Sequence, residues 1–322
     1  MSPDALTSSV DPTTSVPAAA PAVVKVRIGV GLGTRTELNG PTYGAVVDEL
    51  ERLGFDSLWL SEKISGEAPD PLVAMAYGAG RTTSLKFGTS VMVLPGRNPV
   101  VLAKELATLA RMSGGRLLPA FGLGAVDPME QQAFGVERRG RAAIFDESLA
   151  VMRACWTGEP VVHDGERFHY EGVRVLPVPG RLDVWLGGIA PSELRRVGRL
   201  ADGWLPSFIT PADAESGREV IEAVCAEHDR EIEHDHYGVL IPYSHGPAPE
   251  RLLELLARRR PDLDDPSVLV PDSWEALTDS IRQFVDVGTT KFVVLPVHEP
   301  GDAEGWSAHL TELADVVLPL ET

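Results

Sequence analysis

The chain has 322 residues, of which 43% are hydrophobic, so it can bury the core of one large α/β domain or two small ones. Its net charge of −18 opposes binding to nucleic acid and to anionic membrane surfaces. Only two cysteines are present and they lie far apart, which excludes a disulfide framework or a cysteine zinc site and is typical of a cytoplasmic protein.

Residues 1–24 differ in composition from the rest of the chain. They are rich in Pro, Ser, Thr and Ala, and they have neither the basic start nor the apolar block of a secretory signal. No run in the chain reaches the roughly 18 apolar residues of a transmembrane helix. We therefore expect a disordered tail over 1–24 and a folded domain over 25–322, with no membrane partner.

From Lys25 onward, a short aliphatic run is followed by a loop, a stretch with helical periodicity, a glycine and the next run. Tyr43, Val46 and Leu50 show the helical spacing, and Gly54 ends that helix. The expected strands are 25–30, 57–60, 86–93, 117–121, 183–186, 203–206, 237–241 and 291–295. The expected helices lie between them, and include segments near 71–81, 250–259, 274–287 and 306–317.

Strict alternation of strands and helices favours a parallel sheet with helices outside it. Eight strand–helix units predict an α/β fold of one (β/α)8 TIM barrel, and an open doubly wound sheet with fewer strands is the alternative. A polar, alternating stretch around Asp164 and Gly165 predicts a short hairpin in an insertion at about 158–180.

In a barrel the active site lies where the strands end. Gly187 and Gly188 follow an expected strand and precede a helix that has Pro191 near its first turn. Backbone N–H groups there could bind a phosphate at the positive end of the helix. A tight turn that needs glycine only for its dihedral angles explains the same pattern equally well.

Gly122 and Gly124 end another expected strand and would let a flat group approach the backbone closely. Asp127 stands where a third glycine belongs, so this segment is not a dinucleotide-binding fingerprint. Glycine pairs of this kind are weak signals on their own.

Five motifs in a fixed order are more specific: they lie at 58–63, 88–99, 106–116, 183–188 and 201–204. Together they resemble the luciferase-like monooxygenase superfamily and, within it, the deazaflavin-dependent oxidoreductases of actinobacterial type. The resemblance extends from about Val26 to Pro319. It implies that the deazaflavin coenzyme F420 lies across the C-terminal mouth of the barrel.

The resemblance also implies which residues contact the cofactor. The peptide bond between Ser90 and Val91 would be cis and would form a bulge behind the ring. The loop at 187–189 would bind the phosphate, and the chain at 122–124 would lie beside the ring. The implied cofactor-binding residues are Ser61, Glu62, Ser90, Val91, Gly122, Leu123, Gly124, Gly187, Gly188 and Ile189.

The chain departs from some relatives at two places. Glu62 and Lys63 stand where some have an Asp-His pair, and Ala125 stands where sugar-phosphate dehydrogenases of this type carry a glutamate. Both differences argue against sugar-phosphate oxidation and leave the proton donor unassigned.

The candidate catalytic residues are Glu62, Lys63 and His298. A carboxylate in a closed mouth tends to have a raised pKa, so Glu62 could exchange a proton, or it could form a local ion pair. Lys63 could balance the charge of an anionic cofactor, or it could pair with Glu62. His298 ends an expected strand, as His245 does, and either could act as an acid or base or be a surface residue.

No metal site is expected, because the His234–His236 segment precedes a strand, on the rim away from the active site, and shows no third ligand. The leading hypothesis is hydride transfer between F420 and a small organic substrate by a cytoplasmic enzyme. The sequence leaves the oligomeric state open, with a homodimer as one candidate assembly. One alternative is an FMN-dependent monooxygenase on the same fold. The other is a protein that binds a flavin or deazaflavin without turnover.

Overall fold

The computed structural model describes residues 25–322, so the expected disordered tail at 1–24 lies outside the described residues. The strands are β1 (Arg27–Leu32), β2 (Ser57–Leu60), β3 (Lys86–Thr89), β4 (Met92–Val93), β5 (Leu117–Leu118), β6 (Ala120–Gly122), β7 (Val161–Asp164), β8 (His169–Val173), β9 (Trp185–Leu186), β10 (Gly203–Trp204), β11 (Gly238–Tyr243) and β12 (Lys291–Pro296). The α-helices are α1 (Gly40–Leu53), α2 (Pro71–Ala79), α3 (Pro99–Met112), α4 (Pro128–Phe134), α5 (Arg141–Trp156), α6 (Pro191–Leu200), α7 (Pro211–Glu227), α8 (Glu250–Arg259), α9 (Trp274–Asp286) and α10 (Ala303–Val317). Short 3-10 helices are η1 (His234–His236), η2 (Pro266–Leu269) and η3 (Leu318–Leu320).

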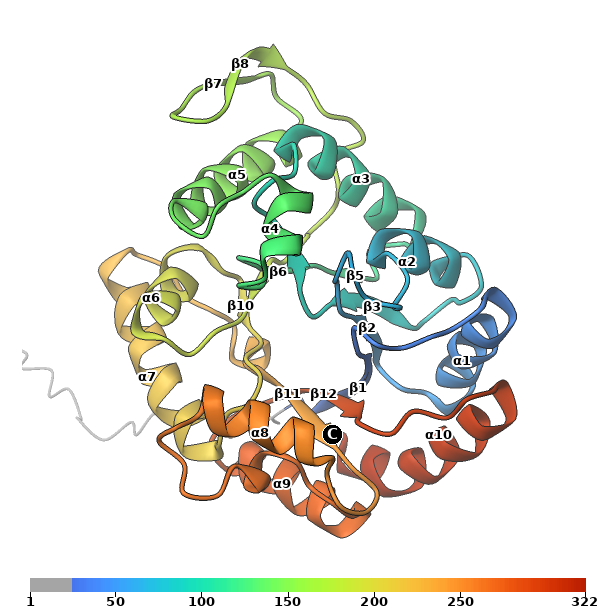
Figure 1. Ribbon diagram of the computed structural model, residues 1–322. Helices are drawn as coiled ribbons and strands as arrows, with labels where there is room; N and C mark the ends of the chain where they lie inside the picture. The colour runs from blue at the N-terminus through green and yellow to red at the C-terminus, as the bar shows by residue number, and fades with distance from the viewer. Residues whose placement is uncertain (1–24) are drawn as a thin grey trace, which may run out of the picture.

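The protein has an α/β fold with parallel strands. One sheet has the order β11-β12-β1-β2-β3-β5 and a second has the order β10-β9-β6-β4, and the pairs within both are parallel. Isolated parallel bridges join Trp204 to Tyr237 and Ser207 to Leu240, next to β10 and β11. Figure 1 shows these strands around a ring, with the helices outside them.

The first strand–helix unit forms for reasons that the sequence contains. The Asn39 side chain caps α1 by accepting a hydrogen bond from the backbone of Thr42, and Gly54 ends the helix at a positive φ of 87°. Tyr43, Val46, Val47 and Leu50 form its buried face, as their helical spacing predicts. Burying this face against the strands is what holds the helix in place.

The third strand is interrupted where the sequence predicts one continuous strand over 86–93. β3 ends at Thr89 and β4 begins at Met92, and the peptide bond between Ser90 and Val91 is cis. The cis bond was implied by the family resemblance and is confirmed. The fourth strand is also interrupted, at Pro119, which separates β5 from β6.

The antiparallel pair β7–β8 lies outside the ring of helices (Figure 1). Its turn over 165–168 agrees with the expected hairpin around Asp164 and Gly165. Glu147 of α5 holds this turn, because its carboxylate accepts hydrogen bonds from the backbone N–H groups of Arg167 and Phe168.

A compact apolar cluster fills the inside of the ring. Its buried members come from several strands and the segments that follow them: Trp59, Ala120, Trp185, Leu205, Leu240 and Val293. Trp59 and Trp185 meet edge to face, with ring centroids 6.3 Å apart. The tryptophans at 59, 185 and 204 are therefore core residues, as expected.

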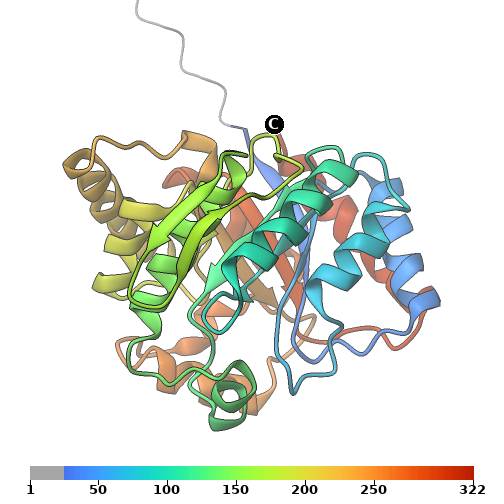
Figure 2. The ribbon, with the colours of Figure 1, turned by 90° about the horizontal axis from the view of Figure 1, so that it is seen from above.

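Two helices extend beyond one end of the ring. Figure 2 shows α4 and α8 at this end, with the C-terminus at the other. The sequence predicts α8 but not α4, whose Asp127 cap and Gly135 terminator flank only 7 residues. None of the helices among residues 25–322 is long and apolar enough to cross a membrane.

Candidate functional site

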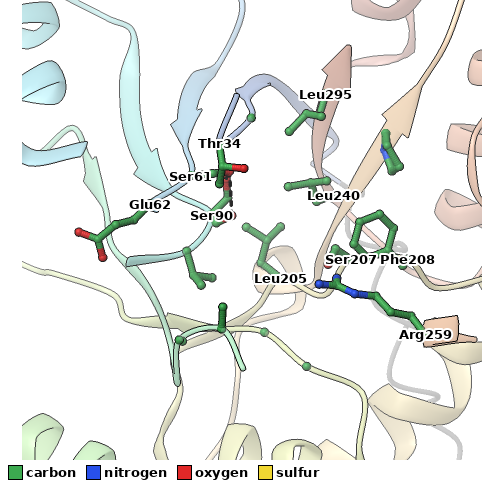
Figure 3. A pocket seen from close by; sticks show the side chains of 18 of the residues that line it. Thr34, Ser61, Glu62, Ser90, Leu205, Ser207, Phe208, Leu240, Arg259 and Leu295 are labelled. Carbon is green, nitrogen blue, oxygen red and sulfur yellow. Dashed lines mark hydrogen bonds between the residues drawn. The ribbon is translucent and has the colours of Figure 1, made fainter. Parts of the chain in front are cut away.

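A cavity of about 1050 Å³ lies where the parallel strands end. Ser61 follows β2, Ser90 follows β3, Gly187 follows β9 and Ser207 follows β10, and all four line it. Figure 3 shows these loops around a shared space, together with Leu240 and Leu295 from β11 and β12. The position agrees with the general rule for barrels and with the sequence prediction.

One wall of the cavity consists of Ser61, Ser90, Val91 and Gly122. The Ser61 hydroxyl lies 3.2 Å from the backbone oxygen of Ser90 and 3.3 Å from its hydroxyl. A Cβ at position 122 would lie 2.5 Å from Cγ2 of Val91, so glycine is required there for this packing. The wall therefore combines exposed backbone, an aliphatic side chain and two hydroxyl groups, which suits a flat molecule with polar edges.

Glu62 lies at the edge of this wall and forms local interactions with both of its carboxylate oxygens. Its Oε1 pairs with Arg97, and its Oε2 accepts a hydrogen bond from the backbone N–H of Val93 at 2.7 Å. Burial raises the pKa of Glu62, while Arg97 and the Val93 N–H oppose this rise. In Figure 3 its carboxylate points away from Ser61 and Ser90, so Glu62 connects two loops rather than facing the centre of the cavity.

The glycine loop after β9 has a partner within its own helix. The backbone N–H groups of Ile189 and Ala190 donate to Oε2 of Glu193, at 3.1 and 3.0 Å. Gly188 has a φ of 94°, and a Cβ there would lie 2.5 Å from the same oxygen. The N-terminus of α6 is thus capped by a carboxylate at the place where the sequence predicts a phosphate.

Arginine side chains surround the cavity of this acidic chain. The lining arginines are Arg35, Arg141, Arg196, Arg251, Arg258 and Arg259. Arg196 pairs with Asp146 at 2.7 Å, and Arg259 lies over the ring of Phe208 at 5.3 Å. Figure 3 shows Arg259 extending from α8 toward Ser207. Clustered cations at one opening attract anionic ligands to it.

The comparison with known protein families agrees with this geometry. Residues 23–287 match the model of the family described as luciferase-like monooxygenase. The chain belongs to this family. Over 316 residues the luciferase-like chain is 26% identical to an F420-dependent glucose-6-phosphate dehydrogenase from Kineococcus radiotolerans, covering 84% of this chain and 90% of that protein.

Solved structures share the fold of this luciferase-like chain. An F420-dependent secondary alcohol dehydrogenase in complex with an F420–acetone adduct has a TM-score of 0.74 at 19% identity, covering 92% of this chain and 100% of the other. The FMN-bound oxygenating constituent of 3,6-diketocamphane monooxygenase from Pseudomonas putida has the same TM-score at 17% identity, covering 92% and 99%.

Most of the site residues expected from the sequence lie together. Those that line the cavity are Ser61, Glu62, Ser90, Val91, Gly122, Leu123, Gly124, Gly187 and Gly188. Ile189 is not among the lining residues. Lys63 is not either, and its Nζ lies 4.0 Å from a carboxylate oxygen of Asp127. His298 is exposed and does not line the cavity, whereas its neighbour Glu299 does.

Sequence reasoning missed Glu299 and the arginines of α8. The α8 segment carries no family motif. The one signal in the sequence is that Arg251, Arg258 and Arg259 lie on the same short expected helix. Glu299 follows directly after His298, and only the path of the loop decides which of the two side chains faces the cavity. Burial raises the pKa of Glu299.

The segment around η1 contains more potential ligand atoms than the sequence suggested. Glu233, Asp235 and His236 each offer one within 4.8 Å of the others. His236 already hydrogen-bonds through Nδ1 with the backbone oxygen of Asp202, at 2.7 Å. Acidic clusters of this kind are common on protein surfaces, and we assign no ion to this one.

Proposed function

We propose that this protein is an F420-dependent oxidoreductase, which transfers a hydride between the deazaflavin and a small organic substrate. The observation that carries the proposal is the cavity at the strand ends, which has a flat glycine-containing wall on one side and arginines around it. The name of the Kineococcus radiotolerans relative supports F420 as the cofactor. Bound there, the deazaflavin would supply the hydride chemistry, while the protein would position the substrate and exclude water.

The ring end of the cofactor would lie on the wall that contains Val91 and Gly122. The Val91 side chain packs into the space left by the missing Cβ of Gly122, so a planar ring on this wall would lie against Val91. The residues that would contact the ring are Ser61, Ser90, Val91, Gly122, Leu123 and Gly124. Glu62 would act as a positioning residue, because it joins the loop after β2 to the turn that carries Arg97.

The phosphate end would lie near the loop of Gly187, Gly188 and Ile189. Glu193 opposes an anion there, so we assign the positive charge to Arg141, which lines the cavity. Burial and the nearby Arg138 lower the pKa of Arg141, and the charge of Glu193 opposes this. Arg141 donates to the backbone oxygen of Gly124 at 2.8 Å and forms no ion pair within 4.0 Å in the described part of the chain. It therefore retains its charge for a ligand.

Titration of the apo-protein with F420 and with FMN tests the cofactor assignment. Tryptophan fluorescence should report binding, because Trp59 and Trp185 lie in the apolar cluster inside the ring of strands. We expect F420 to quench this fluorescence at a much lower concentration than FMN. Tight binding of FMN alone would reject F420 and favour the monooxygenase. If F420 binds but enones, alcohols and imines show no hydride exchange, the protein is a binder without turnover.

We propose further that residues 25–322 form one domain, a closed eight-stranded barrel into which the β7–β8 hairpin is inserted. Among the described residues, β10 and β11 lie at the ends of the two sheets and are not paired by an extended ladder. The parallel bridge between Ser207 and Leu240 lies at this junction and therefore supports closure of the barrel. The cytoplasmic location and the homodimer stay predictions. Sedimentation of the purified protein tests the homodimer.

A further inference from the structure

The loop after β12 places a third carboxylate, that of Glu299, in the cavity. Glu299 lines the cavity and reaches to the loop after β1. Its Oε1 accepts a hydrogen bond from the hydroxyl of Thr36 at 2.6 Å, and the backbone N–H of Gly33 approaches the same oxygen at 3.5 Å. Thr36 is fully buried, so the donor that holds this carboxylate is itself fixed.

Glu299 differs from the other two carboxylates that line the cavity. Glu62 is paired with Arg97, and Glu193 caps α6. Glu299 forms no ion pair within 4.0 Å with any residue in the 25–322 part of the chain, and its Oε2 makes no hydrogen bond there. It is therefore the lining carboxylate whose oxygen is free to contact a substrate.

The surroundings of Glu299 favour the protonated form of its carboxyl group. Burial raises the pKa of Glu299, and the hydrogen bonds from Thr36 and Gly33 only partly oppose this. Tyr243 of β11 is one titratable neighbour, since its pKa is raised by burial and by the charge of Glu299. Arg35 also lines the cavity but forms no ion pair with Glu299 within 4.0 Å. The Tyr243 hydroxyl hydrogen-bonds with Nε2 of His309 at 2.6 Å. A cationic partner that would keep the Glu299 carboxyl ionised is not found among these groups.

We propose that Glu299 is the acid–base residue of the cavity, an inference that rests on the proposed function. When a ketone is reduced, the bound, reduced deazaflavin would supply a hydride, with its two electrons, to the carbonyl carbon and would itself become oxidised. The carbonyl π bond breaks toward oxygen, and that oxygen takes the proton of Glu299 to form the alcohol. Glu299 is left as a carboxylate and regains a proton from water. In alcohol oxidation the carboxylate accepts the hydroxyl proton instead.

A proton donor at this position answers a chemical need. Hydride transfer alone would leave an alkoxide beside the apolar side chains that line the cavity, such as Leu240 and Leu295, which is unfavourable. A positioned acid removes this charge and typically contributes about 10²–10⁴-fold to the rate. Glu62, the acid expected from the sequence, points away from the centre of the cavity in Figure 3.

The protonation of Glu299 can be tested in the apo-protein. We would label glutamate with ¹³C at Cδ, titrate the wild-type protein, and assign the Glu299 resonance by its loss in Glu299→Gln. We expect it to titrate above the ordinary value of about 4.3. Thr36→Val should raise this pKa further, because it removes a hydrogen bond to the charged form. A Glu299 resonance that titrates at or below the ordinary value would overturn the inference.

The role in turnover is tested on the F420-loaded enzyme, with the carbonyl compound that wild type reduces fastest among acetone, cyclohexanone and cyclohex-2-enone. We expect Glu299→Gln to bind F420 within about threefold of wild type and to lose about 100-fold or more in kcat. The matched control is Glu304→Gln, an exposed glutamate at the start of α10, which should change neither value.

The outcomes separate the two proposals. Failure of the wild-type protein to bind F420 would overturn the proposed function, and this inference with it. Normal F420 binding with an unchanged kcat in Glu299→Gln would overturn the inference alone. F420 binding without reduction of any of the three carbonyl compounds would also count against Glu299 as a donor to carbonyl substrates.

Discussion

The carboxylate of Glu193 accepts a hydrogen bond from the backbone N–H of Ile189 at 3.1 Å and so occupies the helix terminus at which a cofactor phosphate is expected. A carboxylate and a phosphate would compete for the same N–H groups and repel each other. The charge at Glu193 should therefore weaken the binding of an anionic cofactor.

Glu193→Gln should tighten F420 binding. The amide oxygen can still cap α6, whereas the negative charge beside the phosphate is lost. We expect an affinity gain of about fivefold, which corresponds to ~1 kcal/mol. Fluorescence titration gives the affinity, and urea unfolding should show a nearly unchanged stability. Weaker F420 binding in this variant would place the phosphate elsewhere.

Arg97→Met should destabilise the protein strongly. The Glu62 side chain is only 3% exposed, so removing Arg97 leaves a buried carboxylate without its charged partner. Loss of one member of a buried pair costs about 3–5 kcal/mol. The double variant Glu62→Gln with Arg97→Met should recover much of this loss, which chemical unfolding of all four proteins would measure. If the double variant is as unstable as the single one, the pair is not the cause.

Gly122→Ala should weaken cofactor binding and reduce stability. The new methyl group would overlap Cγ2 of Val91, which must then move toward the space assigned to the ring. Overpacking of this kind typically costs about 1–3 kcal/mol. Gly180→Ala is the matched control, because a Cβ there meets nothing within 4 Å and its φ is not positive. Equal F420 affinity in both variants would show that Val91 and Gly122 do not contact the deazaflavin ring.

Glu51 should make the stability depend on pH below neutrality. Burial would raise its pKa, but hydrogen bonds from Thr83, Ser84 and Leu85 lower the pKa of Glu51 to about 2. Since the folded pKa is depressed, the contribution of Glu51 is complete above the unfolded value of about 4.3 and is lost as the pH falls toward 2.

The variant Glu51→Gln isolates this contribution. At pH 7 its Tm should be below that of wild type, and the difference should shrink as the pH falls from about 4.5 to 2. Thermal unfolding followed by circular dichroism at several pH values measures this. A Tm difference that does not change with pH would show that the charge of Glu51 does not contribute.

The order of the elements could be predicted from the sequence because strands and helices differ in the period of their apolar residues. The faces of α1 and the position of α8 followed from that period alone. The break between β3 and β4 could not be found in this way, because Ser90 and Val91 fit a continuous strand as well as an interrupted one. Only the family resemblance indicated the cis bond.

Within the site, the sequence located loops better than side chains. The glycines at 122, 124, 187 and 188 line the cavity because a strand end fixes where the backbone lies. After β12, a shift of the loop by one residue decides whether His298 or Glu299 faces the cavity. The sequence has no periodicity in this loop from which that choice could be predicted. The partners of Glu62 and Glu193 depend on contacts that the sequence pattern does not encode.

The arginines around the cavity give this acidic chain an uneven electric field. Because the net charge is −18, most of the protein surface repels a phosphate or a carboxylate. This repulsion is weaker at the opening of the cavity, where Arg35, Arg251 and Arg259 lie. A polyanionic ligand that diffuses along the protein is therefore directed toward one opening. The rate of its capture should fall as added salt shortens the range of that attraction.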